Sequence, residues 1–193
     1  FDDAAGNDYA GISDPTTWDF TTADVIDPTV TDYSPDDDST DVPVDANLVL
    51  TFSEDVNVGT GSIRIKESSG GALFESIPVG DARVTGDGTA VITINPTATF
   101  VSETGYYVEI DATAFDDLTG NSYAGIADNS TWNFTAADVI DPTVTDFSPT
   151  DDATGVAVNA NLVLTFSEPV DIETGDIFIR QTKKTVPRFM NKN

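Results

Sequence analysis

The sequence predicts an all-β chain of tandem β-sandwich units, one complete and two partial, and three observations support this fold class. Apolar and polar residues alternate along short runs, which is typical of half-buried strands. Turn residues separate these runs, and no long amphipathic helical pattern occurs. The sequence also repeats itself at an offset of 114 residues, which is the size of an independently folding domain.

The repeat occurs in three copies of unequal length. Residues 27–66 and 141–180 are identical at 27 of 40 positions, and residues 1–26 and 115–140 are identical at 18 of 26. The sequence therefore predicts the C-terminal strands of a preceding repeat at 1–26, a complete repeat at 27–140, and the N-terminal part of a following repeat at 141–180. Residues 181–193 depart from the pattern and form a basic tail with four basic residues and no acidic one.

Inward-facing positions can be assigned along the complete repeat in order. They are Leu48, Leu50 and Phe52, then Ile63 and Ile65, Val84, Ile92 and Ile94, then Tyr106, Val108 and Ile110, and finally Trp132 and Phe134. Gly-rich turns at 69–71 and 86–88 separate the runs, because hairpin turns favour residues that accept a positive φ. About seven short strands in about 110 residues is typical of an immunoglobulin-like β-sandwich.

The same alternation indicates which aromatic side chains point into the core and which point outward. Trp18 and Phe20 occupy the places of Trp132 and Phe134 one repeat earlier, so we expect all four to be core residues of a last strand. Tyr107, whose strand neighbours point inward, is the better candidate for an exposed aromatic ring.

Composition excludes several functional classes. The chain has 34 acidic and 8 basic residues, a net charge of −26, and no cysteine or histidine. Disulfides, thiolate or imidazole metal sites and Ser-His-Asp catalysis therefore have no side chains to use. Such an acidic surface repels phosphates, so nucleic acid is excluded as a partner. No apolar run approaches the roughly 18 residues of a membrane helix, so no membrane insertion is expected.

The start of the chain carries no signal-peptide pattern, and its first residue is Phe1 instead of Met. We therefore expect the sequence to be a piece of a longer protein.

Several motifs resemble one known family. They are the opening 28–58, with Ser-Pro at 34–35, Val-x-Val at 42–44 and NLVLTFSEDV at 47–56, then TGYYV at 104–108, DLTGN at 117–121 and TWNF at 131–134. In this order they resemble the bacterial Ig-like repeat domain of the S-layer (SbsA-like) type, over all of 27–140 and both partial repeats. The resemblance implies extracellular, tandemly repeated modules of S-layer proteins, adhesins and secreted enzymes, without a shared catalytic site.

These observations together favour a non-catalytic spacer, or stalk, in a bacterial cell-surface or secreted protein. Its partners would be the neighbouring Ig-like repeats of the same chain. The alternative is an extracellular module that binds a glycan or a protein, which an exposed apolar or aromatic patch would favour. The partial repeats raise a further possibility, self-association by strand addition to another copy.

Acidic residues recur at the joints between repeats and suggest a calcium site. Asp24 and Asp27 lie in the first joint, and Asp138 and Asp141 hold the same places in the second. The loop that contains Asp116, Asp117 and Asn121 is the candidate source of further ligands. Calcium takes six to eight oxygen ligands, and extracellular modules bind it at roughly 10⁻⁴–10⁻³ M. A solvated acidic linker at the joints and a tight turn at 116–121 remain the alternative interpretations.

Catalysis and covalent crosslinking are both disfavoured by comparing the repeats. Glu54 recurs as Glu168, but its neighbour Asp55 becomes Pro169, so a glycosidase-like carboxylate pair is not maintained. Lys66 becomes Arg180, which cannot form a lysine isopeptide bond. We therefore expect the chain not to be an enzyme.

Overall fold

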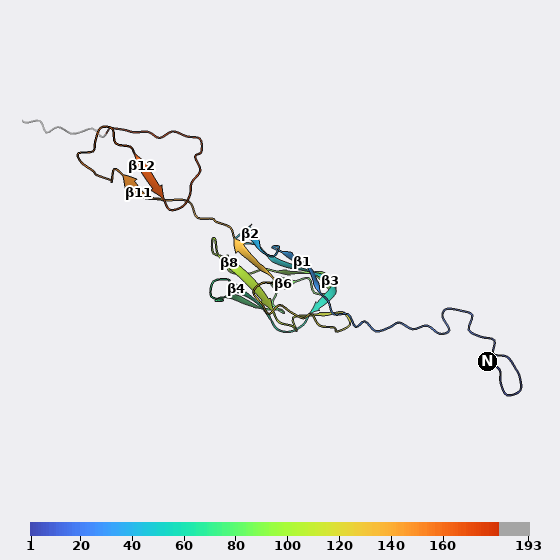
Figure 1. Cartoon of the computed structure of the whole chain (residues 1–193). Coiled ribbons are helices and arrows are strands. Elements are labelled where there is room, and N and C mark those ends of the chain that lie inside the picture. The colour runs from blue at the N-terminus through green and yellow to red at the C-terminus, as the bar shows by residue number, and fades with distance from the viewer. Residues whose placement is uncertain (182–193) are drawn as a thin grey trace, which may run out of the picture. The chain divides into compact units, whose positions relative to one another are not determined.

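A computed structural model describes residues 1–181, in which the chain forms two compact units. The first unit is Phe1–Val139 and the second begins at Ile140. Every regular element among the described residues is a β-strand (Figure 1). Apart from Gln181, the basic tail expected at 181–193 lies outside the described residues.

The first unit contains two five-stranded sheets, which confirms the all-β sandwich class. One sheet has the order β1-β3-β7-β6, with β9 also paired to β3, and the other has the order β2-β10-β8-β4-β5. The strands of the first sheet are β1 (Val30–Ser34), β3 (Leu48–Val58), β6 (Val84–Thr85), β7 (Thr89–Ile94) and β9 (Phe115–Asp117). Those of the second are β2 (Ser39–Val42), β4 (Ser62–Glu67), β5 (Leu73–Pro78), β8 (Gly105–Ile110) and β10 (Asn133–Ala136).

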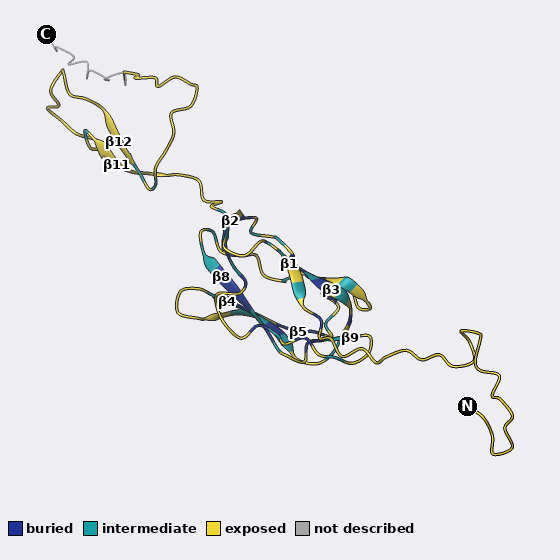
Figure 2. Ribbon diagram, turned by 45° about the vertical axis from the view of Figure 1, so that its right-hand side comes forward, coloured by how far each residue is buried: buried dark blue, intermediate teal, exposed yellow. Residues whose placement is uncertain are grey.

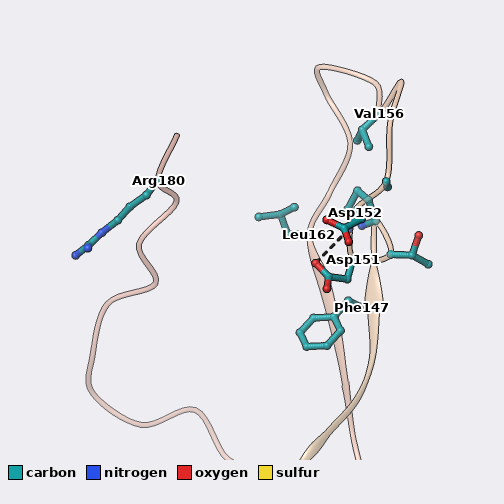
Figure 3. Close-up of a pocket in the computed structure, with 9 residues that line it drawn as sticks. Phe147, Asp151, Asp152, Val156, Leu162 and Arg180 are labelled. Carbon is teal, nitrogen blue, oxygen red and sulfur yellow. Dashed lines mark hydrogen bonds between the residues drawn. The ribbon is translucent and has the colours of Figure 1, made fainter. Parts of the chain in front are cut away.

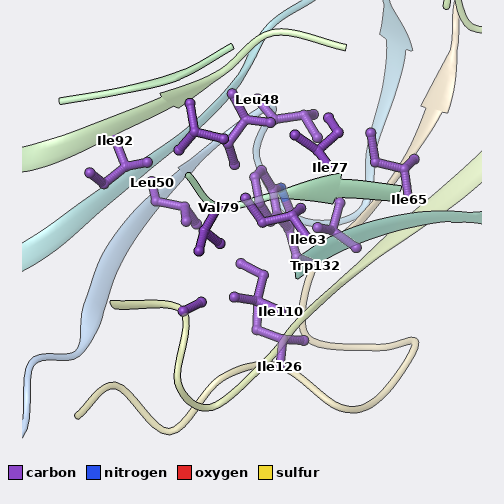
Figure 4. Close-up of a cluster of buried hydrophobic side chains, with 14 of the residues drawn as sticks. Leu48, Leu50, Ile63, Ile65, Ile77, Val79, Ile92, Ile110, Ile126 and Trp132 are labelled. Atoms are coloured by element: carbon purple, nitrogen blue, oxygen red, sulfur yellow. The ribbon is translucent and has the colours of Figure 1, made fainter. Parts of the chain in front are cut away.

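The core lies between these sheets and follows the alternation in the sequence. Leu48, Leu50, Ile63, Ile65 and Ile92 are fully buried, and Figure 4 shows several of these side chains meeting with Trp132. Burying one such aliphatic side chain contributes about 1.5–3 kcal/mol relative to leaving it exposed. The inward positions assigned from the sequence, including Trp132 and Phe134, are all confirmed.

The second and last strands of the sandwich run side by side in the same direction. The chain passes from β1 in one sheet to β2 in the other, and β2 pairs with β10 in parallel, with Ser39 opposite Phe134 and Val42 opposite Ala136. The chain enters near the C-terminal end of β3 and leaves beside Val42, at the other end of the sandwich (Figures 1 and 2). We call these the entry end and the exit end.

Within its described residues, 140–181, the second unit contains one antiparallel pair, β11 (Val144–Ser148) and β12 (Val163–Phe166). Its register reproduces that of β1 and β3, since Val144 lies opposite Phe166 as Val30 lies opposite Phe52. Leu162 and Leu164 are 61% and 47% exposed, whereas their counterparts Leu48 and Leu50 are fully buried. Apolar side chains that form a core in the complete repeat therefore remain accessible in this unit (Figure 2).

Residues 1–26 form no strand, although their counterparts 115–140 include β9 and β10. A single β-bridge joins Asp2 and Asp8. Trp18 and Phe20 are 78% and 84% exposed, in contrast to the core positions expected for them. The reason is that Trp132 and Phe134 are buried by strands of their own repeat, and this sequence contains only the last 26 residues of the preceding one.

No helix within residues 1–181 has the length and apolar character required to cross a membrane.

Candidate functional site

Three carboxylates meet at the entry end of the sandwich. Asp24 precedes the first strand, Glu54 lies within β3, and Asp117 ends β9, and one oxygen of each lies within 4.8 Å of the others. The pairing of β3 with β9, which sets Val56 opposite Asp117, brings the last two together. We call Asp24, Glu54 and Asp117 the entry cluster.

Asp117 is held rigidly by its own loop. Its Oδ1 accepts hydrogen bonds from the backbone N–H groups of Thr119, Gly120 and Asn121 at 2.6–2.8 Å. Its Oδ2 accepts one from the Asn121 side-chain amide at 2.7 Å and one from the Thr119 hydroxyl at 3.1 Å. The role of Asn121 therefore fits the tight-turn interpretation of this loop, because its side-chain nitrogen donates a hydrogen bond to Asp117.

The same loop forms in the partial repeat. Asp3 accepts hydrogen bonds from the backbone of Ala5 and from both the backbone and the side chain of Asn7, at 2.7–2.9 Å. Because residues 1–26 have no sheet to support them, this loop is determined by its local sequence.

Glu54 and Asp117 have pKa values that are shifted in opposite directions. Burial raises the pKa of Glu54, and the negative charges of Asp24 and Asp117 raise it further. Burial acts in the same direction on Asp117, but the hydrogen bonds from Asn121 and Thr119 outweigh it and lower the pKa of Asp117 to about 2. Concentrated negative charge and one oxygen atom from each of three carboxylates make the cluster suitable for a hard cation.

The other residues predicted as calcium ligands lie elsewhere. Asp116 accepts a 2.6 Å hydrogen bond from the Ser122 hydroxyl, and Asp27 is exposed outside the entry cluster. Asp138 accepts a 3.1 Å hydrogen bond from the Ser102 hydroxyl at the exit end. Asp141 is exposed in the second unit. Of the predicted set, the structure brings together only Asp24 and Asp117.

Glu54 is the cluster member that sequence reasoning did not assign to the calcium site. A signal for it existed, because Glu54 recurs as Glu168 whereas the adjacent Asp55 does not recur. Its proximity to Asp117 depends on the β3–β9 pairing, which a single sequence does not reveal.

Both ends of the complete repeat fasten the joint segments to the sandwich. At the entry end, the Thr29 N–H donates to the Ser53 hydroxyl at 3.1 Å, and the Ser53 N–H donates to the Thr29 carbonyl at 2.8 Å. At the exit end, the Val139 N–H donates to the Ser102 hydroxyl at 3.0 Å. The second unit repeats the entry contact between Thr143 and Ser167 at 3.0 Å.

The expectation of an exposed ring at Tyr107 is wrong. Tyr107 is 8% exposed, because the Lys66 side chain lies over its ring, with the ammonium nitrogen 5.8 Å from the ring centroid. Lys66 also pairs with Glu109 at 2.8 Å.

Among solved structures, the chain is similar to CopC from Methylosinus trichosporium OB3b, with 15% identity and a TM-score of 0.41, over 59% of this chain and 97% of that one. This likeness supports no functional argument. No curated protein sequence matches the chain.

The sequence profile of the bacterial Ig-like domain matches residues 24–136 and again 138–192. The two matched stretches begin 114 residues apart, the same offset as the internal repeat. The chain belongs to the bacterial Ig-like domain family.

Proposed function

We propose that the chain is a non-catalytic spacer in a bacterial cell-surface or secreted multidomain protein, of the adhesin or S-layer kind. Domains of this family are typically found in bacterial surface proteins. In this proposal each repeat is a folded segment of fixed length, and its partners are the neighbouring repeats of the same chain.

The observation that carries the proposal is the parallel pairing of β2 with β10. Tension pulls the chain in opposite directions at the entry end before β1 and at the exit end after β10. Because β2 and β10 are parallel, this tension acts as shear along the two strands. Their hydrogen bonds therefore bear the force at the same time. The bond from the Ala137 N–H to the Val42 carbonyl, at 2.8 Å, belongs to this set.

The accessible apolar surface of the complete repeat also supports a spacer over a binding module. Its exposed large apolar side chains come from separate strands and loops and include no aromatic ring. They are Leu73, Val91, Val101, Leu118, Val139 and Ile140. Stacking on a sugar ring requires an accessible aromatic face, and scattered single apolar residues are normal on a soluble surface.

Single-molecule stretching of the full chain between its two ends tests this proposal. We expect one discrete unfolding event that releases new contour length on the order of 400 Å, because the complete repeat unfolds as a unit of about 110 residues at up to ~3.6 Å per residue. Smooth extension without a discrete event would contradict a mechanical role.

We also propose that calcium at the entry cluster stiffens the joint. The cluster joins Asp24, from the segment that follows the preceding repeat, to Glu54 and Asp117 of the complete repeat. A cation held by all three would fix the direction in which the chain enters the sandwich. Asp138 and Glu168 hold the equivalent sequence positions one repeat later. Water molecules would complete the six to eight ligands that calcium requires.

Thermal melts of the full chain test the calcium proposal. The conditions compared are a chelator, millimolar calcium and matched magnesium, at fixed ionic strength. We expect stabilisation by calcium alone, amounting to about 1.4 kcal/mol when calcium is at ten times its dissociation constant.

Two variants make the calcium test specific. Glu54→Gln is expected to abolish the calcium effect, whereas Asp55→Asn, which removes the adjacent exposed carboxylate, is expected to retain it. Identical melts under all three conditions, or equal losses in the two variants, would contradict a calcium site at this cluster.

A further inference from the structure

Three asparagines in the chain are followed two residues later by a threonine. They are Asn95 in Asn-Pro-Thr, Asn129 in Asn-Ser-Thr and Asn133 in Asn-Phe-Thr. Asn-x-Ser/Thr is the acceptor pattern for N-linked glycosylation, provided that x is not proline. Pro96 therefore excludes Asn95, and the sequence leaves Asn129 and Asn133 as candidate acceptors.

The fold makes Asn133 a poor acceptor. Asn133 begins β10, where it lies opposite Tyr107 of β8. Its backbone N–H and its side-chain amide both donate to the Asp37 carboxylate, at 2.9 and 3.0 Å. The nitrogen that would receive a sugar is therefore already held in a hydrogen bond to a charged group.

Asn129 lies in the turn before β10 and is accessible. It is exposed, and its side-chain amide makes no hydrogen bond to any residue within 1–181. The turn is formed by Asp128, which accepts hydrogen bonds from the backbone N–H groups of Ser130 and Thr131 at 2.8 Å. The Thr131 hydroxyl donates its proton to the same carboxylate at 2.8 Å. Its oxygen keeps lone pairs that can accept a hydrogen bond from a transferase.

Trp132 anchors the C-terminal end of this turn. The side chain is fully buried, its indole N–H donates to the Pro35 carbonyl at 2.9 Å, and its ring packs on Tyr33 at a centroid distance of 5.1 Å. In the second unit, Phe147 and Pro149, the counterparts of Tyr33 and Pro35, line a cavity of about 690 Å³ (Figure 3). In the complete repeat the Trp132 ring takes the corresponding place, so the turn that precedes it is fixed at the surface.

The turn itself does not require an asparagine. The equivalent turn forms at 14–17, where Asp14 accepts hydrogen bonds from the Thr16 backbone and from the hydroxyls of Thr16 and Thr17. Pro15 takes the place of Asn129 there. The turn therefore accounts for the aspartate and the two hydroxyl residues, and it leaves Asn129 without a structural role.

We propose that Asn129 is an acceptor site for N-linked glycosylation. In the reaction, the Asn129 Nδ2 forms a bond to C1 of the sugar while the bond between C1 and the phosphate oxygen breaks. The electron pair of that bond leaves with the diphosphate, and one amide proton passes to a base of the transferase. The co-reactant is a diphosphate-activated sugar, carried on a nucleoside or on a lipid. The site does not depend on the spacer function, because the argument uses only the turn and its exposure.

Sugar transfer to the folded full chain tests the proposal, with one arm for each carrier. The first arm uses uridine diphosphate glucose and a soluble asparagine glucosyltransferase. The second uses a lipid diphosphate oligosaccharide and an oligosaccharyltransferase in membrane vesicles. Intact-mass spectrometry and peptide mapping then count and locate the added sugars. We expect one glycan per chain in at least one arm, at Asn129 and not at Asn133, and the successful arm identifies the carrier.

Two variants and a peptide make the test specific. Asn129→Gln is expected to abolish the transfer, because it removes the acceptor pattern. Asn57→Gln, at an exposed position of β3 outside any such pattern, should be modified as the unaltered chain is. A synthetic peptide of residues 127–137 has no sandwich to hold Asn133, so it should accept sugar at both Asn129 and Asn133.

The peptide also shows that each transferase is active. Absence of transfer to the folded chain in both arms, under conditions that modify the peptide, would overturn the proposal. Equal transfer to Asn129 and Asn133 in the folded chain, or undiminished transfer to the Asn129→Gln variant, would overturn it as well.

Discussion

Single aspartates determine the conformation of several loops in this chain. Asp128 accepts hydrogen bonds from the backbone N–H groups and the hydroxyls of Ser130 and Thr131, at 2.8–3.0 Å, immediately before Trp132. Asp14, its counterpart one repeat earlier, accepts equivalent bonds from Thr16 and the Thr17 hydroxyl. The loop forms with or without a surrounding sandwich, so the side chain and its next three residues are sufficient.

Asp128 is expected to make stability depend on acid pH. Hydrogen bonds from the Ser130 backbone and from the Thr131 and Ser130 hydroxyls lower its pKa from 3.8 to about 2. Because the folded pKa is the lower one, the carboxylate contributes stability above about pH 4, and this contribution is lost as pH falls from about 4 to about 2. Asp128→Asn should therefore be less stable at pH 7 and lose less stability over this interval.

Urea unfolding at pH 7, 4 and 2 measures this effect. Asp14→Asn is the matched control, because Asp14 has the same turn and a pKa lowered to about 2, but lies in the segment that forms no strand. It should leave the unfolding of the sandwich unchanged. An Asp128→Asn variant whose stability falls between pH 4 and 2 as steeply as that of the unaltered chain would contradict the assignment.

At the scale of elements, the alternation of residues predicted the buried face of each strand but not which strands pair. Leu48, Leu50 and Phe52 were assigned to the core because side chains in a strand alternate between its faces. The β3–β9 pairing and the parallel β2–β10 pairing join residues far apart in sequence, and no local pattern encodes them. The entry cluster therefore became visible only in the structure.

The prediction that the Tyr107 ring is exposed was wrong for a related reason. Alternation correctly placed Tyr107 on the outer face of its sheet. It does not show which side chain of a neighbouring strand covers that face. Lys66 of β4 covers the ring because β4 pairs with β8 and sets Lys66 opposite Tyr107.

Strand β9 is short, but we expect it to contribute strongly to stability. Phe115 is fully buried, and its ring lies 5.4 Å from that of Phe52 on β3. Phe115→Ala should lower the free energy of unfolding by about 3–5 kcal/mol, since it removes a large core side chain and leaves a cavity.

Leu118→Ala, one residue beyond the same strand, provides the comparison. Leu118 is 60% exposed, and its replacement should change stability by no more than about 0.5 kcal/mol. Urea unfolding measures both values. Similar losses in the two variants would show that β9 does not pack as described.

At the scale of the whole molecule, the 114-residue repeat and its Ig-like character were evident from the sequence. Identity between copies predicted the equal registers of β1–β3 and β11–β12, but residues 1–26 form no strand although they match 115–140. The direction in which tension crosses the sandwich was not evident, because it depends on the parallel β2–β10 pairing. That pairing connects the fold to the proposed spacer function.

Stretching one molecule in two directions tests the spacer account most directly. The chain lacks cysteine, so introduced cysteines provide unique attachment points. Attachment at Thr22 and Asp141 pulls the entry end from the exit end and slides β2 along β10. Attachment at Ser69 and Asp141 pulls from two points near the exit end and opens hydrogen bonds one after another. The account predicts a clearly higher unfolding force for the first pair, and equal or lower force for that pair would contradict it.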